Sequence, residues 1–361
     1  MNSSRKIYLV RHGKPDSPQN EKYCLGQQDR PLGTLGKMQA YLLGEELKGL
    51  VPGGVFCSRL GRATETAAFL SPDYVIFPGL EEASAGEWDG LSFKEIEEKW
   101  PDIFEKRGED TGFEIPGEEP KADAHKRFTD ALRFVLLLTQ GDIAVVSHTT
   151  VMGTLLAECA GEGPEMCRKY RMPYGSYCIL EYNEDGSFST DGVYRIPSLP
   201  LSEELCRSLR DAAGIPDKIK LHCDAVTDEA LRICDELEAT GLNFNRELIR
   251  QAAILHDIAR LEKQHEYCGG EYLKALGYGQ LGDIIRVHGE LENEEIDEAA
   301  IVFIADKNIR ETDRVSVEDR YRLSCDKCHS PEGLEVHERR MNQALRIKEK
   351  INSTCGKEVV I

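Results

Sequence analysis

Residues 7–15 read IYLVRHGKP, and this stretch decides how the first half of the chain folds. Its four leading apolar residues predict a buried strand, which runs directly into Arg11, His12 and Gly13. Arginine and histidine are costly to bury, whereas glycine lets the chain turn tightly. The pattern predicts a strand that delivers an arginine and a histidine to a phosphate pocket at the edge of a sheet.

Strand and helix patterns alternate from residue 5 to about residue 195. Apolar runs at 53–57 and 142–146 predict further strands, and each is followed by a segment with helical periodicity. Such alternation is typical of an α/β domain built around a mainly parallel sheet. Residues 176–196 predict two strands around a turn that contains Asp185 and Gly186, so we expect an antiparallel edge.

Helical periodicity dominates the second half of the chain. The segment 196–204, with Pro197 and Pro200, predicts a linker. Asn245, followed by Glu247, is a typical helix start. Helices are expected at 202–214, 222–241, 245–263, 269–277, 297–309 and 336–352. We therefore predict an α/β domain over residues 1–197, a linker and leading helix over 198–214, and an all-α domain with a helical extension over 215–361.

The composition fits a globular protein of more than one domain. The chain has 361 residues, more than a single core usually serves. Its net charge of −19 argues against nucleic acid as a partner, because a phosphate backbone needs a basic surface. We see no apolar run long enough to span a membrane and no signal-peptide pattern, so we expect a cytoplasmic protein without a membrane partner.

Twelve cysteines are scattered along the chain. Without a secretory signal, reduced thiols are a better interpretation than disulfides. Cys325 and Cys328, followed by His329, match the pattern for covalent haem attachment, but that chemistry belongs to exported proteins. A zinc or redox role is only slightly better supported, so the pair has no assigned role.

Three further segments follow predicted strands and could complete a phosphate pocket around Arg11 and His12. They are SRLGRATETA at 58–67, LEEASAGEWDG at 80–90 and VVSHT at 145–149. Ligands of an open α/β sheet bind beyond the carboxyl ends of its strands, so we expect these segments at one crevice. The ordered motifs resemble the histidine phosphatase superfamily, which includes the cofactor-dependent phosphoglycerate mutases. The resemblance covers about residues 5–195 and implies a three-layer α/β fold.

The resemblance also assigns roles to the motif residues. It implies that His12 is the nucleophile, which takes a phosphoryl group and passes it to water. Arg11 and Arg62 would bind the phosphate oxygens through their planar guanidinium groups. His148 would donate to the same oxygens, and Ser58 would contribute to substrate binding. No cofactor is expected in this domain.

Glu82 would protonate the leaving alcohol, for which its carboxyl group must carry a proton. We prefer it to Glu81 because Glu82 stands four residues before Gly86, the spacing usual in the resembling family. Lys14 departs from the family pattern, in which an acidic residue often follows Arg-His-Gly. It either adds affinity for an anionic substrate or is an ordinary solvated lysine.

Histidines and aspartates recur on separate predicted helices of the second half. Such side chains can meet in the core of a helical bundle and bind metal there. Mixed nitrogen and oxygen ligands suit Mn, Fe, Co, Ni, Zn or Mg, and the residue types do not choose among these ions. The candidate ligands are His222, His256, Asp257, His265, His288 and Asp306.

This arrangement resembles the HD superfamily of metal-dependent phosphohydrolases over about residues 215–325. The resemblance implies that a first His, a His-Asp pair and a distal Asp bind metal, here His222, His256, Asp257 and Asp306. His265 and His288 stand where members with two metals place extra ligands. Side chains of adjacent residues on a helix point about 100° apart. His256 and Asp257 could therefore both reach one ion only if it lay between their two directions.

Lys307, Arg310 and Arg320 could bind substrate phosphates, although at least one of them is expected to be a solvated charge or salt-bridge partner. We expect a bifunctional phosphohydrolase that acts on a small phosphorylated metabolite or nucleotide. The first domain would hydrolyse phosphomonoesters, and the second a nucleotide, phosphodiester or phosphoanhydride. Two alternatives stay open: a non-catalytic, metal-binding sensor in the second domain, and phosphoglycerate mutase activity in the first.

Overall fold

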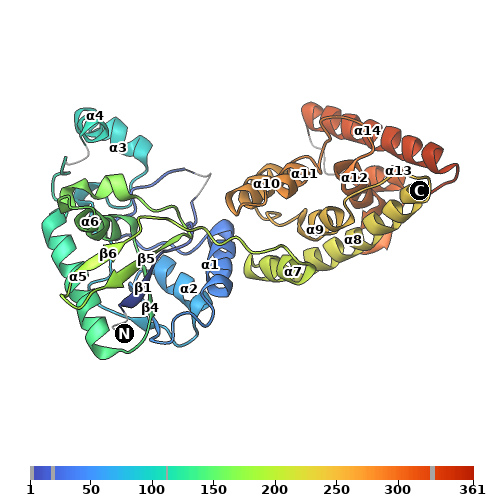
Figure 1. Ribbon diagram of the computed structural model, residues 1–361. Helices are drawn as coiled ribbons and strands as arrows, with labels where there is room; N and C mark the ends of the chain where they lie inside the picture. Colours follow the sequence, from blue (N-terminus) through green and yellow to red (C-terminus); the bar gives the residue numbers. More distant parts are fainter. Residues whose placement is uncertain (1–3, 18–20, 111–112, 326–329) are drawn as a thin grey trace. The chain divides into compact units, whose positions relative to one another are not determined.

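The computed structural model describes residues 4–17, 21–110, 113–325 and 330–361. The chain divides into two compact units between Leu199 and Pro200 (Figure 1). No helix in the described ranges is both long and apolar enough to cross a membrane. The cysteines within them are free thiols, Cys325 included. Cys328 and His329 lie outside the described residues, so the haem-like motif stays untested.

A six-stranded sheet forms the centre of the first unit, with the strand order β3-β2-β4-β1-β5-β6. Four strands run parallel: β1 (Arg5–Arg11), β2 (Val55–Cys57), β3 (Val75–Ile76) and β4 (Ile143–Ser147). Next to them, β5 (Tyr177–Tyr182) runs antiparallel to β1, and β6 (Phe188–Thr190) runs antiparallel to β5. This arrangement confirms the mainly parallel sheet with an antiparallel edge.

Helices cover both faces of this sheet, as the alternating side chains of β1 require. Tyr8 and Val10 pack with α1 (Thr34–Glu46) and α2 (Gly61–Leu70) on one face. Ile7 and Leu9 pack with α5 (Lys121–Leu138) and α6 (Thr149–Cys159) on the other. The three-layer fold predicted for this unit is therefore confirmed. Shorter helices complete it: η2 (Gly86–Trp88), α3 (Phe93–Lys99), α4 (Pro101–Glu109) and η3 (Pro164–Tyr170).

The strand register brings the candidate residues to one edge of the sheet. Arg11, the last residue of β1, pairs with Ser147, the last residue of β4. The end of β2 lies beside β4 as well, with Cys57 opposite Val146. Because these strands are parallel, His12, Ser58 and His148 leave the sheet at its carboxyl edge, where ligands bind in such folds.

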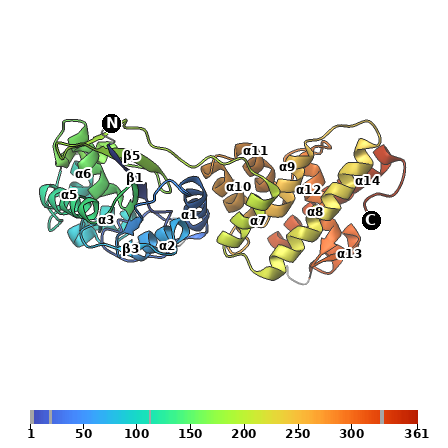
Figure 2. The same cartoon turned by 60° about the horizontal axis from the view of Figure 1, so that its bottom comes forward.

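The second unit is almost entirely helical, as predicted. Its centre is α12 (Glu298–Asn308), which is buried on nearly all sides and packs against α8, α9 and α14 (Figure 2). A short two-stranded ribbon, β7 (Ile309–Arg310) and β8 (Asp313–Arg314), follows it. The other helices are α7 (Glu203–Ala212), α8 (Asp217–Glu238), α9 (Arg246–Leu255), α10 (His265–Ala275), α11 (Gly279–Arg286), α13 (Val317–Arg322) and α14 (Pro331–Cys355).

The helix predicted over residues 245–263 is shorter than expected. It begins as predicted, because the side chain of Asn245 accepts a hydrogen bond from the N–H of Leu248 at 3.1 Å. It ends at Leu255, and the chain continues in turns closed by bonds to the third preceding residue, such as Ile258 to Leu255. His256 and Asp257 therefore lie at and just beyond the helix end. The helix predicted over 297–309 likewise stops at Asn308, since Ile309 pairs with Arg314.

Candidate active sites

His12 lies directly after β1 and is only 4% exposed. Its Nδ1 is 2.8 Å from the carbonyl oxygen of Gly13, to which it can donate, and this tautomer leaves the lone pair on Nε2. Burial, followed by the charges of Arg62 and Arg11, lowers the pKa of His12 well below its ordinary value. A neutral imidazole with an available lone pair has the properties of a nucleophile.

Arg62 is fixed beside this nitrogen from the first turn of α2. Its Nε donates to Nε2 of His12 at 3.3 Å. Its terminal nitrogens donate to the carbonyl oxygens of Gln28 and Gly26 at 2.6 and 2.7 Å. The loop at residues 26–32 therefore holds the guanidinium group in place next to His12.

Arg11 and Tyr174 form another wall of the pocket. The Arg11 guanidinium lies 3.6 Å from the centre of the Tyr174 ring and donates to the carbonyl oxygen of Met172. The ring of Tyr174 is 5.5 Å from that of His12. Sequence reasoning missed Tyr174, which lies in the turn before β5. An aromatic residue in the stretch PYGSY at 173–177 was the one available signal, and it is weak.

His148 completes the group of buried donors. It precedes α6, and its ring centre is 5.0 Å from that of His12. Burial lowers the pKa of His148 well below its ordinary value, and the charges of Arg62, His12 and Arg11 lower it further. Both ring nitrogens of His148 and Nε of Arg11 are buried without a hydrogen-bond partner among the described residues. Buried polar atoms nearly always have partners, so this set suits an anion with several oxygens, such as phosphate.

Glu82 is bound to the N-terminal turn of α6. Its Oε1 accepts from the N–H of Ala83 at 2.9 Å and of Val151 at 3.2 Å, and its Oε2 accepts from Thr150 at 3.1 Å. Glu81 points elsewhere, with a carboxylate oxygen 3.6 Å from Arg59. The carboxylate of Glu82 thus adjoins the helix that begins after His148, and its role as proton donor stays a prediction.

Two backbone segments meet closely next to His12. A Cβ atom on Gly13 would lie 2.3 Å from the carbonyl oxygen of Gly36, and one on Gly36 would lie 2.0 Å from that of Lys14. Neither position has room for a side chain. Lys14 is also tied to α1, since its N–H donates to the side chain of Gln39 at 2.9 Å. The hydroxyl of Ser58 accepts from the N–H of Leu60 at 3.3 Å and shapes the turn into α2, so its role in substrate binding stays a prediction.

In the second unit, the candidate metal ligands gather in two groups. His222, His256 and Asp306 form the first group, and Asp257, His265 and His288 form the second. Within each group the ligand atoms lie within 4.8 Å of one another. All six residues that the sequence singled out are therefore brought together, from five separate helices or the turns that follow them.

Asp306 and Asp257 are at the centres of these groups. Oδ1 of Asp306 lies 3.0 Å from Nε2 of His222 and 3.8 Å from Nε2 of His256. Oδ1 of Asp257 lies 3.3 Å from Nε2 of His265 and 3.7 Å from that of His288.

The other oxygen of Asp257 links the two groups. This Oδ2 lies 3.8 Å from Nε2 of His256, which belongs to the first group. One carboxylate therefore faces both groups. The neighbours His256 and Asp257 mainly serve different groups, and neither stands inside a regular helix.

Backbone carbonyl groups orient three of the histidines. Nδ1 of His222, His256 and His288 lies 3.0, 2.8 and 2.6 Å from the carbonyl oxygens of Glu311, Ala253 and Ile285. Hydrogen bonds of this kind fix the tautomer and direct Nε2 toward a metal. Nε2 of His256 is buried and has no hydrogen-bond partner among the described residues. The donor set therefore fits divalent metal ions held by nitrogen and oxygen.

Left-handed backbone occurs beside this cluster. Gln264, with φ of 54°, immediately precedes His265, and Glu311, with φ of 56°, supplies the carbonyl group that orients His222. Residues with side chains adopt this region at a cost of roughly 1–3 kcal/mol, and functional sites often contain them. Both residues thus set the direction of a candidate ligand.

A cavity of about 540 Å³ opens onto the cluster. Its wall includes the three cations singled out in the sequence: Lys307, Arg310 and Arg320. Nζ of Lys307 donates to Oδ2 of Asp306 at 2.6 Å and to the carbonyl oxygen of His288 at 3.2 Å. Arg310 is exposed, whereas Nε of Arg320 is buried without a hydrogen-bond partner among the described residues. A cationic wall over metal ligands is suited to a phosphorylated molecule.

Comparison with known proteins agrees with this division. The model of the histidine phosphatase superfamily (branch 1) matches residues 7–191, about half of the chain, and that of the HD domain matches residues 221–310. The chain belongs to the histidine phosphatase superfamily and carries an HD domain after its phosphatase domain. Sequence and geometry had pointed to both domains.

The matched relatives align with this chain over part of their length. A bifunctional protein of Mycobacterium tuberculosis is 28% identical over 191 residues, which cover 51% of this chain and 52% of that protein. A 6-phosphofructo-2-kinase/fructose-2,6-bisphosphatase of Caenorhabditis elegans is 32% identical over 163 residues, covering 42% of this chain and 34% of the relative. This chain therefore spans about half or less of the length of these relatives.

Solved structures resemble the first half of the chain. A mycobacterial glucosyl-3-phosphoglycerate phosphatase shares 22% identity and a TM-score of 0.47, covering 52% of this chain and 98% of its own. A putative α-ribazole-5′-phosphate phosphatase of Escherichia coli shares 24% identity and a TM-score of 0.46, covering 55% of this chain and 100% of its own.

Proposed function

We propose that the first unit hydrolyses phosphomonoesters through a phosphohistidine intermediate at His12. The observation that carries this proposal is the neutral His12, whose Nε2 is surrounded by the buried donors of Arg11, Arg62 and His148. These donors suit the negative charge that spreads over the phosphoryl oxygens in the transition state. Relatives whose names include a phosphatase activity support the same class of reaction.

The reaction would proceed in two displacements. First, Nε2 of His12 attacks phosphorus, the bond from phosphorus to the ester oxygen breaks, and Glu82 gives its proton to the leaving oxygen. Water then attacks the phosphohistidine, Glu82 takes a proton from that water, and the bond from phosphorus to Nε2 breaks. The products are an alcohol and orthophosphate, and Glu82 is protonated again.

A single substitution tests this mechanism. His12→Ala should lower the hydrolysis of a phosphomonoester panel by the full chain by about 10³-fold or more. His125→Ala removes a histidine of α5 in the same unit and is the matched control. Acid-stopped reactions with labelled substrate should yield phosphohistidine in the control and none in His12→Ala. Turnover retained by His12→Ala would refute the proposal.

For the second unit, we propose metal-dependent hydrolysis of a phosphodiester or phosphoanhydride, such as that of a nucleotide. Two metal-ligand groups beneath a cationic cavity wall carry this proposal. A bound divalent metal supplies a hydroxide from water near neutral pH and neutralises phosphoryl charge. Asp257 and Asp306 would hold the metal, backbone carbonyls would aim the histidines, and Lys307 would add positive charge beside Asp306.

Chelation separates the two activities. EDTA should abolish hydrolysis of nucleoside diphosphates or phosphodiesters and leave phosphomonoester turnover at His12 unchanged. His256→Ala should act like EDTA, whereas Asp235→Ala, at an exposed aspartate of α8, is the control. Metal binding without hydrolysis of any nucleotide or phosphodiester tested would contradict the catalytic proposal and favour a metal-binding sensor.

A further inference from the structure

Three donor atoms on α13 and α14 are buried and have no hydrogen-bond partner in the parts of the chain that the structure describes. They are Nε of Arg320, the hydroxyl of Tyr321 and Nε of Arg340. Arg320 and Arg340 both line the cavity above the metal ligands. Unpaired buried donors are rare, because each loses its water without a replacement. Within the described residues these three donors therefore lack an acceptor, which a bound ligand could supply.

Tyr321 directly follows Arg320 in α13. It is 6% exposed, and the charges that act on it include those of Asp306, Arg340 and Arg320. A phenol hydroxyl is a hydrogen-bond donor, and that of Tyr321 is buried without a partner among the described residues.

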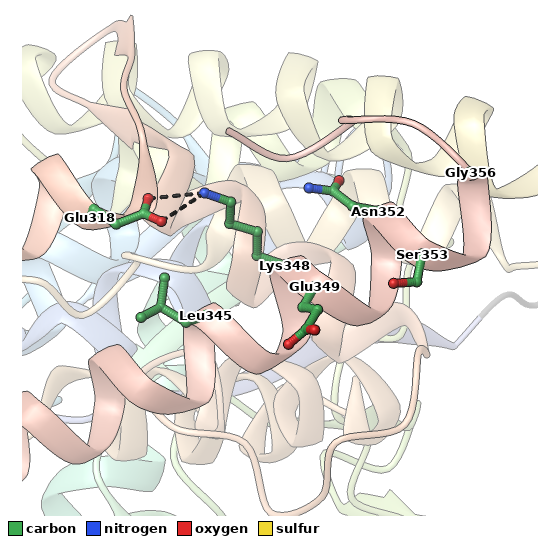
Figure 3. Close-up of a pocket in the computed structure, with 7 residues that line it drawn as sticks. All are labelled: Glu318, Leu345, Lys348, Glu349, Asn352, Ser353 and Gly356. Atoms are coloured by element: carbon green, nitrogen blue, oxygen red, sulfur yellow. Dashed lines mark hydrogen bonds and ion pairs between the residues drawn. The ribbon is translucent and has the colours of Figure 1, made fainter.

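Contacts away from the cavity hold these donors in position. Lys348 of α14 donates to both carboxylate oxygens of Glu318 on α13, at 2.9 and 3.0 Å (Figure 3). Arg340 forms two ion pairs: a terminal nitrogen lies 3.7 Å from Glu266, and Nε lies 3.6 Å from Glu290, too far for a hydrogen bond. The donors are therefore arranged before any ligand binds, which lowers the entropic cost of binding.

Three other cations of the cavity have close partners, and a fourth, Arg310, is exposed. Lys218 pairs with Glu311 at 2.8 Å, and Lys307 pairs with Asp306 at 2.6 Å. Arg260 lies 2.7 Å from Nε2 of His265, one of the candidate metal ligands. Neither α13 nor α14 carries a candidate metal ligand. Arg320, Tyr321 and Arg340 thus form a group that is chemically separate from the metal cluster.

We propose that Arg320, Tyr321 and Arg340 form a second anion subsite, which binds a phosphate group of the substrate other than the one attacked at the metals. The substrate of the second unit would then carry at least two phosphate groups, as nucleoside diphosphates and triphosphates do. This assignment of substrate class rests on the catalytic function proposed above for the second unit. The binding of an anion to the subsite does not rest on that catalytic function.

Pyrophosphate is the probe for the subsite itself. Calorimetric titration of the full chain in EDTA removes any contribution from metal. Arg320→Gln and Arg340→Gln should each weaken the pyrophosphate affinity about tenfold or more, and Tyr321→Phe a few-fold, as expected for lost charge-assisted and neutral hydrogen bonds. Pyrophosphate that binds in the first unit contributes equally to every variant. The effect of a subsite substitution is therefore the difference in affinity between that variant and the unsubstituted chain.

Neighbouring arginines supply the controls. Arg322→Gln and Arg339→Gln remove the same charge from the same two helices, but their side chains are exposed and pair with Asp319 and Glu290. Both should bind pyrophosphate like the unsubstituted chain. Tyr321→Phe keeps the buried ring, so it serves as the variant least prone to misfold. Equal affinity in the three subsite variants and the two controls would overturn the proposal.

Metal-loaded protein separates this proposal from the catalytic one. With Mn²⁺ added, Arg320→Gln should raise the KM for a nucleoside diphosphate about tenfold and leave the KM for the matching cyclic phosphodiester, which has one phosphate, unchanged. A chain that binds pyrophosphate through the subsite but hydrolyses neither compound would refute the catalytic function and support the subsite. Equal KM changes for both compounds would refute the second phosphate position while hydrolysis itself stands.

Discussion

Nε of Arg62 donates to Nε2 of His12 at 3.3 Å, so the arginine proposed to bind phosphate holds the nitrogen proposed to attack it. The two other donor groups of Arg62 bind the carbonyl oxygens of Gln28 and Gly26, which leaves the guanidinium little freedom. An arriving phosphoryl group would replace His12 as the acceptor of this Nε. The nucleophile would be released at the moment when its target is in place.

Arg62→Lys should therefore impair the phosphatase strongly although the charge is kept. Lysine offers a single nitrogen and cannot reach His12, Gln28 and Gly26 in one plane. We expect phosphomonoester turnover to fall by about 10²–10³-fold, the range seen when one preorganised donor is lost. Arg59→Lys, at an exposed position near Glu81, is the control and should leave the rate unchanged. Full activity in Arg62→Lys would exclude the geometric role.

The buried histidines make the first unit sensitive to acid. The pKa values of His12 and His148 are lowered in the folded chain, chiefly by burial, so below about pH 6.5 the unfolded chain binds more protons than the folded one. The free energy of unfolding should therefore fall between pH 7.5 and 5.5, by up to about 1.4 kcal/mol per histidine and pH unit.

Urea titration followed by tryptophan fluorescence measures this effect in the first unit alone. Both tryptophans of the chain, Trp88 and Trp100, belong to that unit. His148→Asn should show a smaller loss of stability on acidification than the unsubstituted chain. His125→Asn should show the same loss as the unsubstituted chain. An unfolding free energy that does not fall toward pH 5.5 would contradict the buried, neutral state of both rings.

Asp257 should matter to metal binding more than any one histidine of its group. Because its two oxygens face different groups, Asp257→Ala should weaken binding at both, whereas His265→Ala should affect one. Elemental analysis after dialysis against Mn²⁺ should give two ions per chain for the unsubstituted protein, one for His265→Ala and fewer than one for Asp257→Ala. Asp235→Ala, an exposed aspartate of α8, is the control. Binding of only one ion by the unsubstituted chain would contradict two separate metal sites.

Glu311 offers a test of the left-handed backbone beside His222. Glycine adopts this conformation without strain, so Glu311→Gly should raise the free energy of unfolding by about 0.5–1 kcal/mol and keep the metal affinity. Glu311→Val should lower both, because a β-branched residue disfavours positive φ. Thr312→Gly, in ordinary backbone next to it, should destabilise. Thermal unfolding with and without Mn²⁺ measures these effects, and a destabilised Glu311→Gly would argue against strain.

Several elements of the fold could be predicted because their signals are local. Alternating apolar residues marked β1 and β4, and the polar residues that follow these strands marked the pocket. The end of α9 at Leu255 had no such signal, since Ile258 and Ala259 continue the apolar periodicity and neither glycine nor proline interrupts it. Just beyond this end, Asp257 faces His265 and His288, contacts that depend on how the later helices pack.

The site was predictable to a similar extent. Residues within sequence motifs, such as His12 and His256, could be found because the motif carries their chemistry. Tyr174 and Tyr321 could not, because each acts through neighbours that only the folded chain brings close. Arg320 was singled out by its charge, but the unpaired donors around it are visible only in three dimensions.

The close meeting of Gly13 and Gly36 has a practical consequence for mutational screens. Gly36 is part of α1 and is given no role in chemistry, yet any side chain there would push against the backbone that carries His12. A screen that scores activity alone would mark Gly36 as a catalytic position. Measuring protein abundance beside activity would separate such a misplaced nucleophile from a chain that fails to fold.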